Sequence, residues 1–232
     1  MTTRPPGPVT IERDQIWPVI WAERLRLADL LTGLAADDWD QPSLCAGWTI
    51  RDVAAHLTLQ QLSARAAIGM MVTYRGDTDR AIRESARSRA AAWPAGKIIA
   101  ELRGTAGSPR HNFGVSCRES LIDVLVHAQD IAIPLGRPHP VPPEAAACAT
   151  TRIWTMHWPP PFPARRVMAG FRVTATDIDW KAGQGPPVHA PISAILLLSA
   201  GRLAALPRVS GAGAAQLAEA LNRLDRPKAG VN

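Results

Sequence analysis

The sequence predicts a mainly α protein with a small α+β tail: an antiparallel four-helix bundle followed by a small carboxy-terminal α+β domain. Hydrophobic residues make up 47% of the 232 residues, and the abundance of alanine and arginine favours helices over sheets. Four helical segments in about 135 residues are typical of a bundle. Prolines then cluster between Pro134 and Pro143 and again from Pro159 to Pro163. We therefore expect two domains, residues 1–143 and 144–232.

The first helix is expected between residues 10 and 34, with Thr10 as its amino-terminal cap. Pro18 either kinks this helix or marks its true first turn. Thr49 is followed three residues later by Asp52, a spacing typical of a capping box. The sequence therefore predicts that a second helix begins at Thr49, and we expect it to run past Ala67.

The third helical region is expected at about residues 77–102, with a break near Trp93, which a proline follows. Glycine, proline, serine and asparagine then mark a loop. Ser116 and Glu119 form a second capping-box pattern. The fourth helix should begin there and end near Gly136.

The carboxy-terminal part has a different pattern. Residues 166–176 alternate apolar and polar side chains, which predicts a strand. The longest apolar stretch, residues 190–206, is interrupted by Gly201 and falls short of the roughly 20 residues that cross a membrane. It therefore predicts a buried helix and no membrane partner. A last amphipathic helix is expected at about residues 213–224.

Composition excludes several classes of protein. The three cysteines, Cys45, Cys117 and Cys148, form no CxxC pair, which argues against a disulfide scaffold and a thiolate zinc site and predicts a reducing cytoplasm. The amino terminus is polar and proline-rich, unlike a signal peptide. The net charge of +6 comes without a helix-turn-helix or basic tail. We interpret it as solvated surface, so nucleic acid is not the expected partner.

His56, Asp123 and His127 are the candidate metal ligands. Asp123 and His127 lie four residues apart, a spacing that brings their donor atoms close enough to share one ion. Glu119 and Asp130 belong to the same stripe of that helix. If the helix of His56 packs beside it, three side chains close on one divalent ion with an open coordination position, which distinguishes a catalytic site from a structural one. Alternatively, the stripe faces water and His56 is a hydrogen-bonded core residue.

The donor types do not select one ion. Imidazole and carboxylate suit zinc, iron, nickel or manganese. Two imidazoles and one carboxylate, with water in the fourth position, form a familiar zinc arrangement for hydrolytic or Lewis-acid chemistry.

Three segments carry a family resemblance. Residues 43–57, Ser-Leu-Cys-Ala-Gly-Trp-Thr-Ile-Arg-Asp-Val-Ala-Ala-His-Leu, resemble the signature helix of the mycothiol-dependent maleylpyruvate isomerase family, a branch of the DinB-like metal-binding bundles. Residues 121–136, centred on Val-His-Ala-Gln-Asp, resemble the family's second metal helix. Residues 174–180, continuing through Gly201 and Arg202, resemble its small carboxy-terminal domain.

The resemblance implies a DinB-like four-helix bundle that holds a divalent metal, usually zinc, through His56, Asp123 and His127. Asp123 stands where the family usually has glutamate, which leaves the identity of the metal open. Asp130 either orients the site by accepting a hydrogen bond from one of the metal ligands or serves as a ligand itself.

The implied activity is metal-dependent isomerisation or S-transfer on a small electrophilic substrate, with a mycothiol-like thiol as cosubstrate. Arg83 and Arg87 lie four residues apart on one helix face and are candidates for binding carboxylates of an anionic ligand. The alternative for these arginines is solvated helix surface. The alternative for the whole protein is a non-catalytic metal- or ligand-binding regulatory module on the same bundle.

Overall fold

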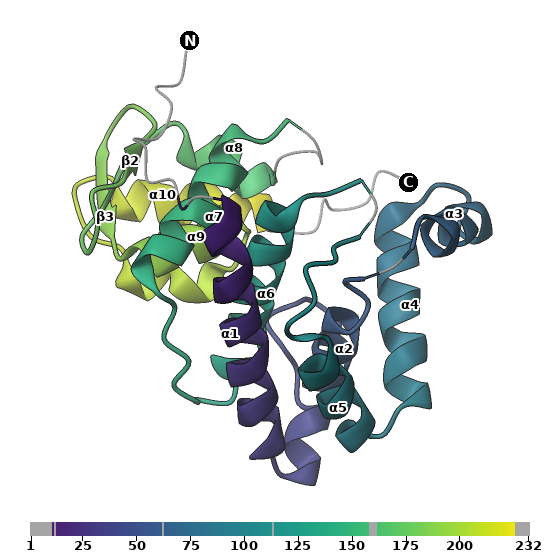
Figure 1. Ribbon diagram of the computed structural model, residues 1–232. Coiled ribbons are helices and arrows are strands. Elements are labelled where there is room, and N and C mark those ends of the chain that lie inside the picture. The colour runs from purple at the N-terminus through teal and green to yellow at the C-terminus, as the bar shows by residue number, and fades with distance from the viewer. Residues whose placement is uncertain (1–10, 12, 62, 113, 158–161, 226–232) are drawn as a thin grey trace, which may run out of the picture. The chain divides into compact units, whose positions relative to one another are not determined.

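The computed structural model describes residues 11, 13–61, 63–112, 114–157 and 162–225 (Figure 1). The chain divides into two compact units. We call Glu12–Pro140 the helical unit and Val141–Asn232 the α+β unit. That residues 1–143 and 144–232 are independently folding domains stays a prediction.

The helical unit contains α1 (Arg13–Thr32), the 3-10 helix η1 (Ala36–Asp40), α2 (Ile50–Leu57), α3 (Ala64–Thr73), α4 (Thr78–Ala92), α5 (Ala95–Thr105) and α6 (Cys117–Ala132). In Figure 1, α1 runs beside α6, against which it packs, and α3 lies across one end of α4. Helix α1 also packs against α5, and α2 packs against α4 and α6.

Buried aliphatic side chains from α1, α2, α5 and α6 form one core in this unit, including Leu27, Leu31, Ile50, Val53, Ile98, Leu102 and Ile131. Each such side chain contributes roughly 1.5–3 kcal/mol when it is removed from water. The core therefore holds α2 against α6, the two helices that carry the candidate metal ligands.

Both predicted capping boxes are confirmed. The Thr49 hydroxyl accepts a hydrogen bond from the Asp52 amide, and the Asp52 carboxylate accepts from the Thr49 amide at 2.9 Å. The Ser116 hydroxyl accepts from the Arg118 amide, and Glu119 accepts from the Ser116 amide at 2.7 Å. These bonds satisfy amide groups that a helix start leaves unpaired, so they fix where α2 and α6 begin.

The prediction that the second helix continues past Ala67 is wrong, because α2 ends at Leu57 and α3 begins only at Ala64. The Thr58 hydroxyl donates to the Ala55 carbonyl at 2.7 Å, a side-chain bond that competes with regular helix geometry. The Thr58 and Leu59 amides also bond three residues back, at 3.1 and 2.8 Å. The chain turns here and brings Gln60 inward.

The other predictions for this unit hold with small shifts. The break near Trp93 is confirmed, since Trp93 follows the last residue of α4. Pro18 lies inside α1, so it does not mark the start of the helix. Thr10, the predicted cap, lies outside the described residues.

The α+β unit contains α7 (Pro143–Thr155), α8 (Pro163–Met168), β1 (Arg172–Ala175), β2 (Lys181–Ala182), β3 (Pro187–Ala190), α9 (Ile192–Ser199), η2 (Leu203–Arg208) and α10 (Ala214–Asp225). The sheet order is β2-β1-β3; β1 pairs antiparallel with β2 and parallel with β3. Val173 lies opposite both Ala182 and Val188.

The predicted strand at 166–176 is too long. Pro163 opens the short helix α8, and only Arg172–Ala175 is extended. Proline favours the first position of a helix because its fixed φ suits the turn and its missing amide hydrogen is not needed there. The remaining elements agree with the predicted mainly α fold with a small α+β tail. In the described part of the chain, none of the helices combines the length and apolar character that a membrane crossing requires.

Candidate metal centre

The structure brings together the three predicted ligands. His56 lies in the last turn of α2, and Asp123 and His127 lie one turn apart on α6. Asp123 Oδ1 is 3.4 Å from His56 Nε2 and 3.2 Å from His127 Nε2. Each of the three offers a donor atom, and these atoms all lie within 4.8 Å of one another. By type and proximity, this donor set fits a divalent ion such as zinc.

Charge is concentrated in this cluster. Burial raises the pKa of Asp123, but the nearby His56 and His127 imidazoles outweigh burial and bring that pKa well below its usual range. Burial lowers the pKa of His127, but the Asp123 carboxylate and hydrogen bonds to Asp123, Asp130 and Cys45 raise it well above its ordinary value. The carboxylate therefore attracts positive charge to this point, and a cation and protons compete for the same imidazole.

Asp130 lies on the opposite side of His127 and is fully buried. Its Oδ2 is 2.8 Å from His127 Nδ1 and accepts a hydrogen bond from the Cys45 thiol at 3.0 Å. Cys45, His127 and Asp130 thus form a second group of metal-ligand type. Because Asp130 faces Nδ1, it favours the tautomer with a proton there and leaves Nε2 free to bind an ion.

The loop before α2 supplies an aromatic side chain to the cluster. Ser43 folds this loop by donating through both its amide and its hydroxyl to the Trp48 carbonyl, each at 2.9 Å. Gly47 has φ of +73°, a conformation that glycine adopts without strain. The Trp48 ring centroid lies 5.4 Å from that of His56 and 6.5 Å from that of His127. The indole therefore lies beside both imidazoles.

The two candidate anion-binding arginines are exposed on α4. Arg87 donates to the Gly47 carbonyl at 2.8 Å and lies 4.0 Å from the Glu84 carboxylate. Its guanidinium thus contacts the loop that carries Cys45 and Trp48. That Arg83 and Arg87 bind a ligand's carboxylates stays a prediction.

Sequence reasoning missed Gln60 and Arg24 as residues of the site. The Gln60 amide nitrogen donates to Asp123 Oδ2, and Gln60 Oε1 accepts from Arg24 Nη2 at 3.3 Å. Burial lowers the pKa of Arg24, and the Asp123 carboxylate opposes that shift. A signal was present for Arg24, because it interrupts the apolar stripe that Ile20 and Leu27 continue along α1.

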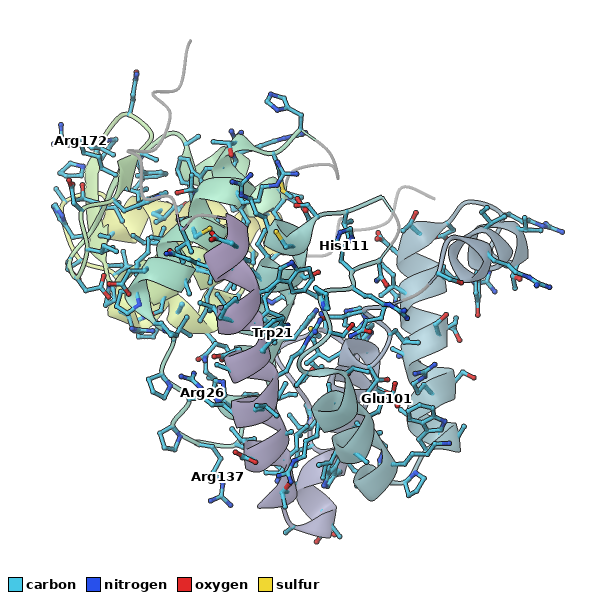
Figure 2. The ribbon with its side chains drawn as sticks, in the orientation of Figure 1. Trp21, Arg26, Glu101, His111, Arg137 and Arg172 are labelled. Atoms are coloured by element: carbon cyan, nitrogen blue, oxygen red, sulfur yellow. The ribbon has the colours of Figure 1, made fainter. Side chains whose placement is uncertain are left out.

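A cavity of about 480 Å³ in the same unit is a separate feature. Its lining comes from α1, including Arg26 and Asp29, and from residues 137–140, which follow α6. Figure 2 labels Arg26 and Arg137 on the same side of α1. None of the lining residues belongs to the group of His56, Asp123 and His127.

Part of the chain is similar to a known protein family. Residues 20–106 match the model of the mycothiol maleylpyruvate isomerase N-terminal domain. The matched stretch runs from within α1 to the residue after α5 and includes His56, whereas Asp123 and His127 lie beyond it. No curated protein and no solved structure matches the chain.

Proposed function

We propose, from the match of residues 20–106 to the mycothiol maleylpyruvate isomerase N-terminal domain, that this protein is a metal-dependent enzyme. It uses a mycothiol-like thiol as cosubstrate for isomerisation or S-transfer on a small electrophilic substrate. That substrate is anionic if Arg83 and Arg87 contact it. A cytoplasmic location belongs to the same proposal.

The main observation that supports the proposal is that His56 Nε2, Asp123 Oδ1 and His127 Nε2 lie close together. Two helices separated by about 60 residues of chain converge on this point, and such bundle interiors commonly house metals. The side chains of His56, Asp123 and His127 are 15, 30 and 14% exposed. Partial exposure of the carboxylate is compatible with access by a small ligand.

In this proposal His56, Asp123 and His127 hold the ion, with zinc preferred over nickel, iron and manganese. A bound zinc ion would supply Lewis acidity that lowers the pKa of a thiol, so that thiolate forms at neutral pH. Asp130 Oδ2 accepts a hydrogen bond from Nδ1 of His127 and so keeps Nε2 directed at the site. Trp48 covers both imidazoles on one side and limits their exposure to water.

A second candidate function is a non-catalytic metal- or ligand-binding regulatory module. The position of the cavity favours it, because the 480 Å³ space is lined by residues outside the histidine–aspartate group. Turnover separates the two functions. A regulatory module would bind metal and thiol but would not accelerate the reaction of a thiol with an electrophile above its uncatalysed rate. The enzyme would accelerate that reaction.

Elemental analysis and thiol titration test the proposal. Protein prepared without chelator should contain about one equivalent of metal, because a formed site of this kind retains its ion. His56→Ala and Asp123→Ala should lose the metal and, with it, thiol binding measured by calorimetry.

His111→Ala is the matched control, since His111 lies in the same unit, stacks on Trp17 at 6.2 Å and is outside the cluster. It should keep both metal and thiol. Metal-free wild-type protein that binds the thiol with undiminished affinity would refute the proposed function.

A further inference from the structure

The Asp123 carboxylate has its two oxygens in different environments. Oδ1 faces the imidazole nitrogens, at 3.4 Å from His56 Nε2 and 3.2 Å from His127 Nε2. Oδ2 accepts a hydrogen bond from the side-chain amide of Gln60. One oxygen is thus directed at the candidate metal position, and the other is engaged by an amide.

The orientation of the Gln60 amide is determined by its second partner. Arg24 Nη2 lies 3.3 Å from Gln60 Oε1. A guanidinium can only donate, so the atom facing it must be the amide oxygen. The amide nitrogen therefore faces Asp123, where it can only donate. Gln60 is 4% exposed, so water competes little for either bond.

Arg24 is itself held in place. It is 3% exposed, and its Nη1 donates to the carbonyls of Thr105 and Ser108 at 3.3 and 3.4 Å. A buried guanidinium is costly unless its charge and donors are satisfied. Here the carbonyls of Thr105, the last residue of α5, and of Ser108 accept from Nη1, and the Asp123 carboxylate supplies nearby negative charge. These hydrogen bonds link four parts of the helical unit in series: the end of α5, Arg24 on α1, Gln60 in the turn after α2, and Asp123 on α6.

We propose that Gln60 and Arg24 are positioning residues that make Asp123 a one-oxygen metal ligand, with Oδ1 presented to the ion and Oδ2 kept away from it. This inference rests on the proposed function. A carboxylate that bound through both oxygens would occupy one more coordination position. By engaging Oδ2, Gln60 keeps that position open for the thiol or the electrophile.

Cobalt substitution of the full-length protein tests the inference, because the visible absorption of Co²⁺ weakens as its coordination number rises. Gln60→Met removes the amide at nearly constant length. The freed Oδ2 should then join the ion, so the cobalt bands should lose intensity relative to the wild type. Zinc affinity, measured by competition with a chelating dye, should fall by about ten- to a hundredfold, because the carboxylate is no longer held in one orientation and the added contact of Oδ2 does not restore that loss.

Gln61→Met is the matched control. Gln61 is the next residue, and its amide donates to the Thr105 carbonyl at 3.2 Å; no contact of it with Asp123 is seen among the described residues. This variant should keep the wild-type cobalt spectrum and zinc affinity. Gln60→Asn is the second test variant: it retains an amide but is too short to span Asp123 and Arg24, so it should move the spectrum in the same direction as Gln60→Met. If Gln60→Met fails to fold, the spectrum of Gln60→Asn tests the positioning role of Gln60.

The outcomes separate this inference from the proposed function. If the wild type loads cobalt, His56→Ala loses it, and Gln60→Met and Gln60→Asn match Gln61→Met in spectrum and affinity, the positioning role is overturned and the metal centre stands. If the wild type loads neither cobalt nor zinc, the proposed function and this inference fall together. Bands weakened in the Gln60 variants alone support the positioning role.

Discussion

Asp123 and Asp130 approach opposite nitrogens of one imidazole ring. Asp123 Oδ1 is 3.2 Å from Nε2 of His127, and Asp130 Oδ2 is 2.8 Å from Nδ1. A histidine that binds metal through one nitrogen commonly donates the proton on the other to a carboxylate. The two acids are therefore expected to differ in role: Asp123 contacts the ion, and Asp130 fixes the ring that contacts it.

Substituting each acid separates these roles. Asp130→Asn retains an oxygen that can accept from His127 Nδ1, so it should keep about one equivalent of metal while its affinity falls by about ten- to a hundredfold. Asp123→Ala should lose the metal altogether. Competition titration with a chelating dye measures both, and melting curves of the metal-free variants control for folding. Metal retained by Asp123→Ala and lost by Asp130→Asn would reassign the ligand to Asp130.

On the scale of a single element, helix α1 carries two acidic residues with charged or imidazole partners, one buried and one exposed. Glu23 is 1% exposed, and its carboxylate lies 2.6 Å from His139 Nε2 and 2.9 Å from Arg26 Nη2. Asp29 pairs with Arg103 at 2.7 Å, but the Asp29 side chain is 72% exposed. The Glu23 pair ties α1 to the segment that follows α6, whereas water solvates the Asp29 pair.

Stability should reflect this difference. Glu23→Ala leaves the buried His139 ring nitrogen without its partner and is expected to lower the free energy of unfolding by about 1–3 kcal/mol. Asp29→Ala breaks an exposed pair on the same helix and should cost no more than about 1 kcal/mol. Urea denaturation of both variants provides the measurement. Equal losses would mean that the Glu23 contacts do not hold α1 in place.

Helix starts could be predicted from the sequence, but the end of α2 could not. A capping box is local, because its side chains and amides lie within three residues, and so Thr49–Asp52 and Ser116–Glu119 locate α2 and α6 correctly. The end at Leu57 depends on a competing Thr58 bond and on the tertiary contact of Gln60 with Asp123. The tertiary contact is not visible in the local sequence, so the sequence predicts a second helix that continues past Ala67.

The same distinction applies to the site. The four-residue spacing of Asp123 and His127 can be read from the sequence of a single helix. It predicts a short distance between the two side chains, and the structure shows that short distance. Gln60, Arg24 and Cys45 come from three other segments. The contacts of Gln60 with Asp123, of Arg24 with Gln60 and of Cys45 with Asp130 depend on how those segments pack. Periodicity within one element carries no information about such packing.

On the scale of the whole molecule, the candidate metal ligands His56, Asp123 and His127 and the residues that contact them all lie between residues 12 and 140. The helical unit has its own buried core around Leu27, Val53 and Ile131. In the α+β unit, Trp154 and Trp180 pack edge to face at 5.5 Å, and their indole nitrogens donate to Ser199 and Thr151. Each unit thus has an apolar interior of the kind that sustains a domain.

A fragment of residues 1–143 should therefore fold and bind metal without the remainder of the chain. Its unfolding should be cooperative by circular dichroism, because a core of this size is sufficient for one domain, and its metal stoichiometry and affinity should equal those of the full-length protein. A fragment of residues 1–116 is the matched control: it ends before α6, lacks Asp123 and His127, and should bind no metal. If 1–143 unfolds cooperatively yet takes up no metal while the full-length protein does, the prediction that the helical unit alone forms the centre is wrong. If it does not fold at all, the predicted boundary between residues 143 and 144 is wrong, since the helical core then depends on residues beyond it.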